Sequence, residues 1–199
     1  MILLLTGNAW ALEHPPAPGD MVFRQGTEPV SDVVMAMDNS GYSHVGMLVG
    51  EPDNWQVLHA IPEAGVTLEP LASFIAPEQA SLHAIYHIEA SHKLRQQAVA
   101  FAESRLGEPF RITAHDASIE IDHEASPSTG TYCTLLIHDA WLAAGLDLQA
   151  SFKRINMPLA RGDFLLPSGL QASPLTHLIS QDTIISGDKN TDKQAQTEQ

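Results

Sequence analysis

The chain has 199 residues, which suffices for one well-filled hydrophobic core and is too short for two domains of ordinary size. Ten Lys and Arg against 24 Asp and Glu give a net charge of −14, which argues against nucleic acid and anionic membranes as partners. Apolar residues make up 44% of the chain and charged residues 17%, a composition that indicates a folded protein rather than a disordered one.

The first eleven residues have features of an export signal. An apolar run at residues 2–5 is followed by Ala9-Trp10-Ala11, which has the pattern of a signal-peptidase cleavage site, but no basic segment precedes the run. Residues 1–11 are therefore either the end of a longer signal peptide, with Leu12 the first mature residue, or an apolar arm that packs on the domain. The first interpretation predicts a soluble periplasmic or secreted protein. No apolar run approaches the roughly 20 residues of a membrane span.

Five apolar runs predict β-strands in a domain that we expect over residues 19–186, after a proline-rich linker at residues 12–18. The predicted strands are Asp20–Arg24, Ser43–Gly50, Trp55–Ala60, Gly65–Leu68 and Leu82–Ile88. The turn composition of Glu51–Asn54 predicts that the second and third strands form an antiparallel hairpin. Between the first two strands, Ser31 is typical of the N-cap of a short helix that continues to Met37.

Two longer helices are predicted in the second half of the chain. Ser91 caps a helix that runs to Leu106 and ends at Gly107, and Thr131–Ala144 forms a helix that ends at Gly145. Between them, the stretch Pro109–Gly130 lacks periodicity and predicts a loop. Three shorter predictions complete the chain: a strand over Gly162–Leu166, one or two helical turns within Ser173–Ser180, and a disordered tail over residues 187–199.

Cys133, the one cysteine, falls in the first turn of the last long helix, where the helix dipole and free N–H groups are expected to lower the pKa of its thiol. A nucleophilic thiol needs a base and a group that orients the base. His44 and His59 lie at the outer ends of the predicted hairpin, roughly opposite each other, and are the candidates. The alternative is that Cys133 is an inert small apolar residue and that each strand histidine is a satisfied polar residue.

A zinc site formed by His44 and His59 with Glu120 or Asp122 is a second alternative. The sequence has no HExxH motif, no paired cysteines, no G-x-S-x-G elbow and no glycine-rich phosphate loop. We therefore expect neither a metal nor another cofactor.

Five short motifs follow one another along the chain: Gly19–Arg24, Tyr42–Gly46, Val57–Ala60 with Gly65-Val66, Tyr132-Cys133-Thr134 and Ala144–Leu148. In this order they resemble the YiiX-like proteins, which are the circularly permuted, papain-like branch of the NlpC-type cell-wall peptidase superfamily. The resemblance runs from about Gly19 to about Pro174 and extends to lecithin retinol acyltransferase. The resemblance implies an α+β, permuted papain-like fold in which an antiparallel, histidine-bearing sheet precedes and packs against the helix that carries the cysteine.

By the same resemblance, Cys133 matches the nucleophile, His44 the general base, and His59 the residue that orients the base. Tyr42 and Tyr132 are candidates for substrate binding, with core packing as the alternative. The sequence departs from the family pattern after the cysteine, where Thr134-Leu135 replaces the usual Ser-Glu. A family carboxylate is therefore absent.

The preferred hypothesis is a thiol hydrolase that cleaves an amide bond through a Cys-His-His triad and an acyl-enzyme. By analogy with the superfamily, its substrate is a stem-peptide amide of peptidoglycan. Two alternatives stay open. One is a lipid or N-acyl amide hydrolase or acyltransferase of the same fold, and the other is a binding module that has lost catalysis.

Overall fold

The computed structural model describes residues 14–38, 40–115, 130–157 and 160–183. The predicted signal peptide, the predicted tail and most of the 109–130 loop lie outside these residues. A six-stranded sheet in the order β4-β3-β2-β1-β5-β8 forms the centre, and all its neighbouring strands are antiparallel. Its strands are β1 (Met21–Gly26), β2 (His44–Glu51), β3 (Asn54–Ile61), β4 (Gly65–Pro70), β5 (Ala80–Ile88) and β8 (Thr176–Thr183).

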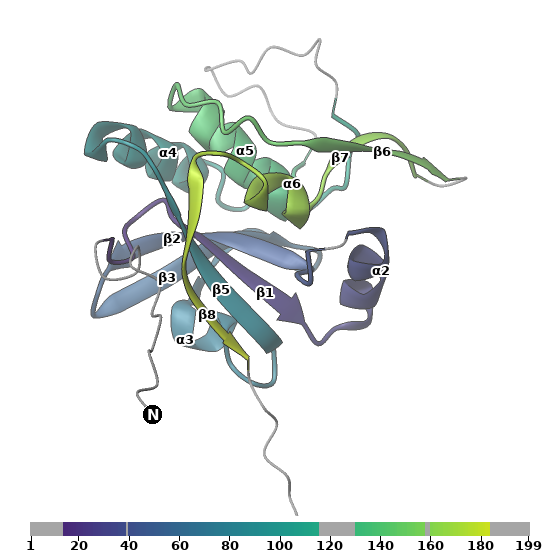
Figure 1. Ribbon diagram of the computed structural model, residues 1–199, viewed down its shortest axis with the longest axis horizontal. Coiled ribbons are helices and arrows are strands. Elements are labelled where there is room, and N and C mark those ends of the chain that lie inside the picture. The colour runs from purple at the N-terminus through teal and green to yellow at the C-terminus, as the bar shows by residue number, and fades with distance from the viewer. Residues whose placement is uncertain (1–13, 39, 116–129, 158–159, 184–199) are drawn as a thin grey trace, which may run out of the picture.

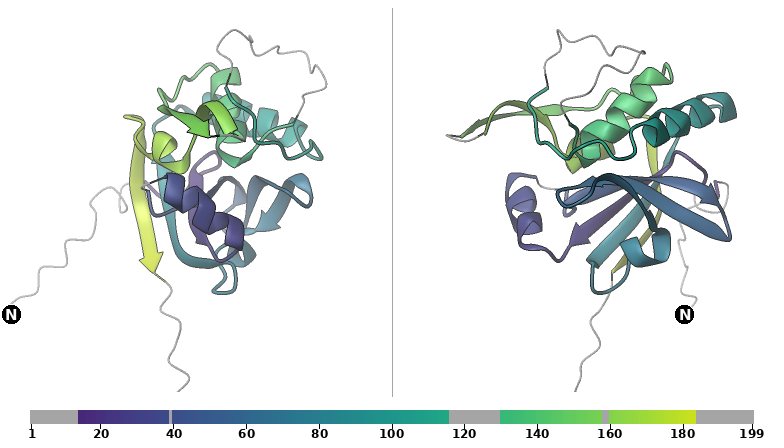
Figure 2. Two further views of the ribbon diagram at one scale, coloured as in Figure 1. Left: turned by 90° about the vertical axis from the view of Figure 1, so that its right-hand side faces the viewer. Right: turned by 180° about the vertical axis from the view of Figure 1, so that it is seen from behind.

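Helices cover this sheet unequally (Figure 1). Helices α4 (His92–Ser104) and α5 (Cys133–Ala143) lie side by side across one face, with α6 (Pro167–Gln171) beside them. Among the helices of the described residues, α3 (Leu71–Phe74) alone lies on the other face, as the view from behind also shows (Figure 2). Helix α2 (Pro29–Met37) stands at one side of the sheet. We call the two sheet faces the helix face, under α4 and α5, and the α3 face.

Strict alternation along the strands separates two apolar cores. Phe23, Val45 and Leu58 point to the helix face and pack with α5 residues such as Trp141, whereas Leu48 and Val57 point to the α3 face and pack with Phe74. Side chains of successive residues must leave a strand on opposite sides, so the sequence positions fix which core each one joins.

The predicted hairpin is confirmed. Strands β2 and β3 are joined at a tight turn in which Glu51 pairs with Asn54. Met47 pairs with Leu58, and continuing this register by one residue sets His59 beside Gly46. The two histidines are therefore diagonal neighbours on one face rather than directly opposite.

Helix α4 has the predicted cap, because the Ser91 side chain accepts a hydrogen bond from the Leu94 N–H. Helix α5 begins two residues later than predicted, at Cys133. The prediction that Ser31 caps α2 is wrong: Glu28 is the N-cap, and the Ser31 hydroxyl lies within the first turn and donates to the Glu28 carboxylate. A proline in the first turn favours this earlier start, since its missing N–H has no helical partner there.

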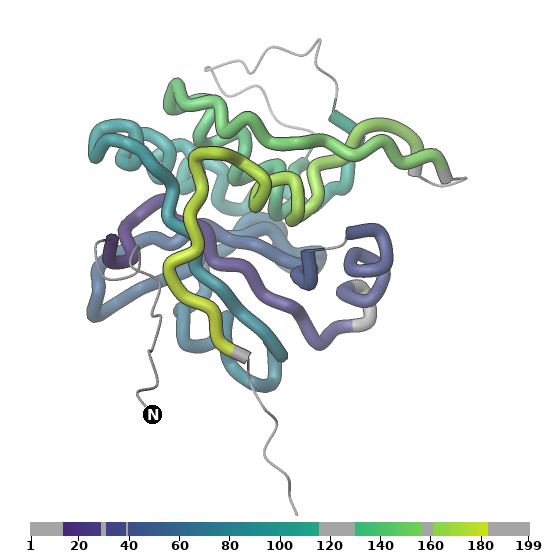
Figure 3. The backbone as a smooth tube through the Cα atoms, viewed as in Figure 1, coloured from purple at the N-terminus to yellow at the C-terminus, as the bar shows by residue number. Residues whose placement is uncertain are grey.

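The prediction of helical turns within Ser173–Ser180 is also wrong. After α5 the chain runs out along β6 (Phe152–Met157), returns along β7 (Ala160–Leu165), passes α6 and descends as β8 beside β5 (Figure 3). Strand β8 covers the edge of β5, and this pairing decides its conformation. In the described residues no helix is long and apolar enough to cross a membrane.

Candidate active site

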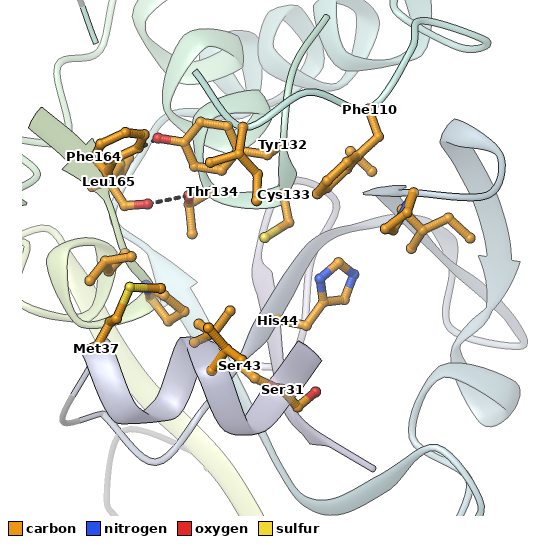
Figure 4. A pocket seen from close by; sticks show the side chains of 18 of the residues that line it. Ser31, Met37, Ser43, His44, Phe110, Tyr132, Cys133, Thr134, Phe164 and Leu165 are labelled. Atoms are coloured by element: carbon orange, nitrogen blue, oxygen red, sulfur yellow. Dashed lines mark hydrogen bonds between the residues drawn. The ribbon is translucent and has the colours of Figure 1, made fainter. Parts of the chain in front are cut away.

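A cavity of about 360 Å³ opens beside the N-terminus of α5, bordered by α2, the ends of β2 and β3, and β7 (Figure 4). Cys133 and His44 both line it. Most of the other lining side chains are apolar, among them Val34, Met37, Ile61, Phe110, Ile155 and Phe164. A cavity with this lining suits a hydrocarbon group better than a charged one.

Cys133 is the first residue of α5, and its N-cap, Tyr132, makes no side-chain capping hydrogen bond. Burial raises the pKa of the Cys133 thiol to about 11, although the backbone N–H groups of Val45, Thr134 and Cys133 itself act in the opposite direction. The expectation that the helix N-terminus lowers this pKa is therefore wrong, because desolvation of the thiolate outweighs the nearby N–H groups. The resting thiol is neutral.

Alkylation of Cys133 by iodoacetamide is expected to accelerate by about tenfold per pH unit up to about pH 10, because only the thiolate reacts. The rate is measured by intact mass at a series of pH values, and the single cysteine makes the site of reaction unambiguous. A rate that reaches its plateau below pH 8 would show a thiolate–imidazolium pair and contradict the neutral thiol.

His44 and His59 form a hydrogen-bonded pair on the α3 face. The His44 Nε2 atom lies 2.9 Å from His59 Nδ1, and both rings pack against Phe74 of α3. Gly46 makes this approach possible, since a Cβ there would lie 3.1 Å from the His59 Cβ and closer still to Val57. The glycine of the Tyr42–Gly46 motif thus leaves room for the second ring.

Both imidazoles are neutral at pH 7. Burial lowers the pKa of His44 well below its usual value, and His59 and Arg24 lower it further. Burial, followed by the Arg24 charge, lowers the pKa of His59 to about 4. Each ring therefore carries one N–H, and the state of the pair is defined by the tautomer of each ring.

The thiol and the His44 ring approach the same cavity from different elements, as Figure 4 shows. His44 is the first residue of β2, and this N-terminal end of the strand lies beside the N-terminus of α5. Within the described residues, no hydrogen bond joins Cys133 to His44. Substrate-free active sites often hold nucleophile and base further apart than the substrate complex does.

The two tyrosines have different environments. Tyr132 lines the cavity, and its hydroxyl oxygen accepts a hydrogen bond from the Leu165 N–H. Tyr42 is only 3% exposed, packs against Phe23 and does not line the cavity, so the alternative of core packing describes it better than substrate binding. Burial raises the pKa of each phenol to about 12.

The zinc alternative receives no support from the histidine geometry. The two facing nitrogen atoms are 2.9 Å apart and aimed at each other, whereas two nitrogens bound to one tetrahedral zinc would be roughly 3.3 Å apart and aimed at the metal. Among the described residues, no group of three or more His, Cys, Asp or Glu side chains is arranged to hold a metal. Glu120 and Asp122 lie outside the described residues.

Sequence reasoning missed a buried arginine beside the histidines. Arg24 is 4% exposed and its guanidinium lies 4.5 Å from the centre of the Phe74 ring. It donates hydrogen bonds to the Phe74 carbonyl, to Gln79 and to Glu28. Arg24 lies opposite His44 in the register of β1 and β2. The Gly19–Arg24 motif alone does not reveal this register.

Comparisons with known proteins agree with this architecture. Residues 15–163 match the profile of the family described as permuted papain-like amidase enzyme, YaeF/YiiX, C92 family. A crystal structure of metalloprotein YiiX from Escherichia coli O157:H7 is similar to the chain, with a TM-score of 0.65 and 20% sequence identity over 85% of this chain and 99% of that one. No curated protein matches the chain.

The chain belongs to the permuted papain-like amidase family, since the match covers well over half of its residues. The α+β fold, with the histidine-bearing antiparallel sheet before the cysteine-bearing helix, is the predicted permuted papain-like arrangement. The protein is accordingly an enzyme of the papain-like amidase class, which implies an amide substrate.

Proposed function

We propose that Cys133 is the nucleophile of an amide hydrolysis in which His44 is the general base and His59 orients it. The observation that carries this proposal is that the Cys133 thiol and His44 open on one cavity, while His59 holds the far side of the His44 ring. His44 Nε2 is engaged by His59, which leaves Nδ1 as the nitrogen for the thiol proton.

Acylation begins when the substrate carbonyl enters the cavity and the thiol and base close on it. The Cys133 proton passes to His44 Nδ1 as the sulfur attacks the carbonyl carbon, so no thiolate has to exist beforehand. The N–H groups at the uncapped start of α5 hold the oxyanion. The tetrahedral intermediate then loses its amine, which takes the proton from His44, and leaves a thioester on Cys133.

In deacylation, water is the nucleophile and the Cys133 sulfur is the leaving group. His44 Nδ1 takes a proton from a water molecule, whose oxygen attacks the thioester carbon. The carbon–sulfur bond breaks, the acid leaves, and the sulfur regains the proton from His44. The net reaction is amide plus water to acid plus amine.

The apolar lining favours a substrate whose acyl group is a hydrocarbon chain, which is the lipid or N-acyl amide alternative. A stem-peptide amide of peptidoglycan is the second candidate and rests on the resemblance alone. Stem peptides carry carboxylates, and neither the apolar lining nor a net charge of −14 favours them. Location in the periplasm, where peptidoglycan lies, depends on the export signal that residues 1–11 suggest.

Hydrolysis of N-acyl-7-amino-4-methylcoumarin amides with acyl chains of increasing length tests the acyl group. We expect kcat/KM to rise by about threefold to fourfold per CH₂ until the cavity is filled, because each buried CH₂ contributes about 0.8 kcal/mol. Met37→Gln, a change of similar size in the lining, is expected to reduce the chain-length dependence and leave the acetyl amide unaffected.

The outcomes separate the candidates. Cleavage of purified muropeptides without a chain-length effect on the coumarin amides would favour the peptidoglycan amidase. Loss of all hydrolysis in Cys133→Ala, with the fold intact, is required by either candidate. Wild-type protein that cleaves nothing, and a Cys133→Ala variant that retains the cellular function, would favour the binding module.

A further inference from the structure

A carboxylate follows the two histidines along the α3 face. His44, His59 and Glu69 stand on the adjacent strands β2, β3 and β4, and Glu69 alternates with Leu68 so that it shares the face of His59. The His59 Nε2 atom lies 3.5 Å from Glu69 Oε2. This nitrogen is buried and has no hydrogen-bond partner within the described residues, so the carboxylate is the acceptor that faces it.

The role of His44 as a base determines the direction of the hydrogen bonds from His44 through His59 to Glu69. As a base, His44 must keep Nδ1 free of a proton, so its proton is on Nε2 and is donated to His59 Nδ1. His59 can accept there only when its own proton is on Nε2. That proton then points to Glu69 Oε2.

The Glu69 carboxylate is held in turn by Gln79, whose amide is oriented by Arg24. Arg24 donates from Nη1 to Gln79 Oε1 at 3.0 Å, and because a guanidinium cannot accept, this contact fixes the orientation of the Gln79 amide. The Gln79 amide nitrogen therefore faces Glu69 Oε1, at 3.5 Å. One oxygen of Glu69 thus accepts from the Gln79 amide, and the other faces His59 Nε2 at 3.5 Å.

We propose that Glu69 is a positioning residue of the active site: by accepting the Nε2 proton of His59, it sets His59 as an acceptor for His44 and so keeps His44 Nδ1 open for the thiol proton. The proposal rests on the proposed function of His44. Its role in positioning is the one that a carboxylate has behind a metal-bound or catalytic histidine elsewhere. The chain thus has a carboxylate at the site despite Leu135, which stands where the family pattern has Glu.

The charged and titratable groups around His59 are consistent with this role. They are Arg24 from β1, His44 from β2 and Glu69 from β4, with Cys133 from α5 beyond His44. Glu69 is the acid among them that faces His59, while Glu28 pairs with Arg24 at 2.9 Å.

Long-range ¹H–¹⁵N correlation spectra of the full chain at pH 7 test the proposal directly, because they report which ring nitrogen of a histidine is protonated. His59 signals are assigned by their loss in His59→Asn. We expect the Nε2–H form of His59 in the wild type and a shift to the Nδ1–H form, or a mixture, in Glu69→Met. The Nδ1–H form in the wild type would overturn the proposal without any variant, even if Glu69→Met does not fold.

A double-mutant cycle gives the kinetic readout. Glu69→Met is expected to lower kcat/KM for the best coumarin amide by about 10-fold to 100-fold, as loss of an outer partner does at histidine metal sites. In the His59→Asn background, the same change should have an effect of about twofold or less, since the Asn carbonyl accepts from His44 whatever residue 69 is. Glu51→Met, an exposed acid at the hairpin turn, is the matched control and should match the wild type.

Equal losses from Glu69→Met in the two backgrounds would show that Glu69 acts on stability or elsewhere, and would overturn its role through His59. Failure of the proposed function would be recognised by other results. Either His44→Ala would leave amide hydrolysis unchanged, or the wild type would have no activity. The tautomer of His59 is measurable in both cases.

Discussion

Replacing His44 with alanine is expected to lower kcat/KM for the best amide substrate by about 10³-fold, because general acid–base catalysis typically contributes about 10²-fold to 10⁴-fold. A base is needed here because burial raises the pKa of the Cys133 thiol to about 11, so that free thiolate is scarce at pH 7. His44 Nδ1 is the proposed acceptor of the thiol proton as the sulfur attacks, and His44→Ala removes it. Initial rates with the coumarin amide, measured at saturating and limiting substrate, give the change.

Two controls separate catalysis from folding. His44→Gln retains a side chain that can donate to His59 Nδ1, so this variant should fold like the wild type and be as inactive as His44→Ala. His83→Gln changes a half-buried histidine on β5 that pairs with Asp182 at 3.6 Å, away from the cavity, and should retain activity. A loss of less than threefold in both His44 variants, with kcat unaffected, would show that His44 is not the base.

Replacing Asp20 with asparagine is expected to lower the free energy of unfolding by about 3–5 kcal/mol, the usual cost of removing one partner of a buried ion pair. Asp20 is fully buried just before β1, and its Oδ1 accepts from Arg95 Nη1 at 2.7 Å and from the Ile88 N–H at 3.2 Å. Its Oδ2 accepts from the Ala17 N–H and faces His87. An amide cannot accept from all four groups, and the Arg95 charge would stay buried.

Urea unfolding followed by far-ultraviolet circular dichroism measures this change, with an unchanged m-value as the sign that the unfolded state is unaffected. Asp182→Asn is the matched control, because its side chain is 75% exposed beside His83 and such surface pairs contribute little. A loss for Asp20→Asn as small as that of the control would contradict the structural role of the Asp20–Arg95 pair.

Local signals predicted the parts of the fold that depend on neighbouring residues. Alternating apolar residues around the Glu51–Asn54 turn were enough for the hairpin, because a two-residue turn sets its register. The Ser91 cap was predictable because its partner, Leu94, is three residues away. Strand β8 was not, since it is a strand only through its pairing with β5, about 90 residues earlier in the chain.

The candidate site likewise has residues that local sequence predicts and residues that only long-range strand pairing brings together. Cys133, His44 and His59 were found from motifs and hairpin spacing, and the short distance between the two rings agrees with that expectation. Glu69 and Arg24 come to His59 through the registers of three strand pairs, which no single segment contains. The pKa of Cys133 depends on how deeply the cavity buries the sulfur, and the position of the residue in its helix does not reveal that.

The covalent role of Cys133 is tested by intact-mass spectrometry of the wild type, quenched milliseconds after mixing with an activated ester, p-nitrophenyl hexanoate. We predict an added mass of one hexanoyl group, located on Cys133 by peptide mapping, that disappears as the thioester hydrolyses and that is absent in Cys133→Ala. Release of p-nitrophenol by a wild-type protein whose Cys133 never carries the acyl group would contradict the account.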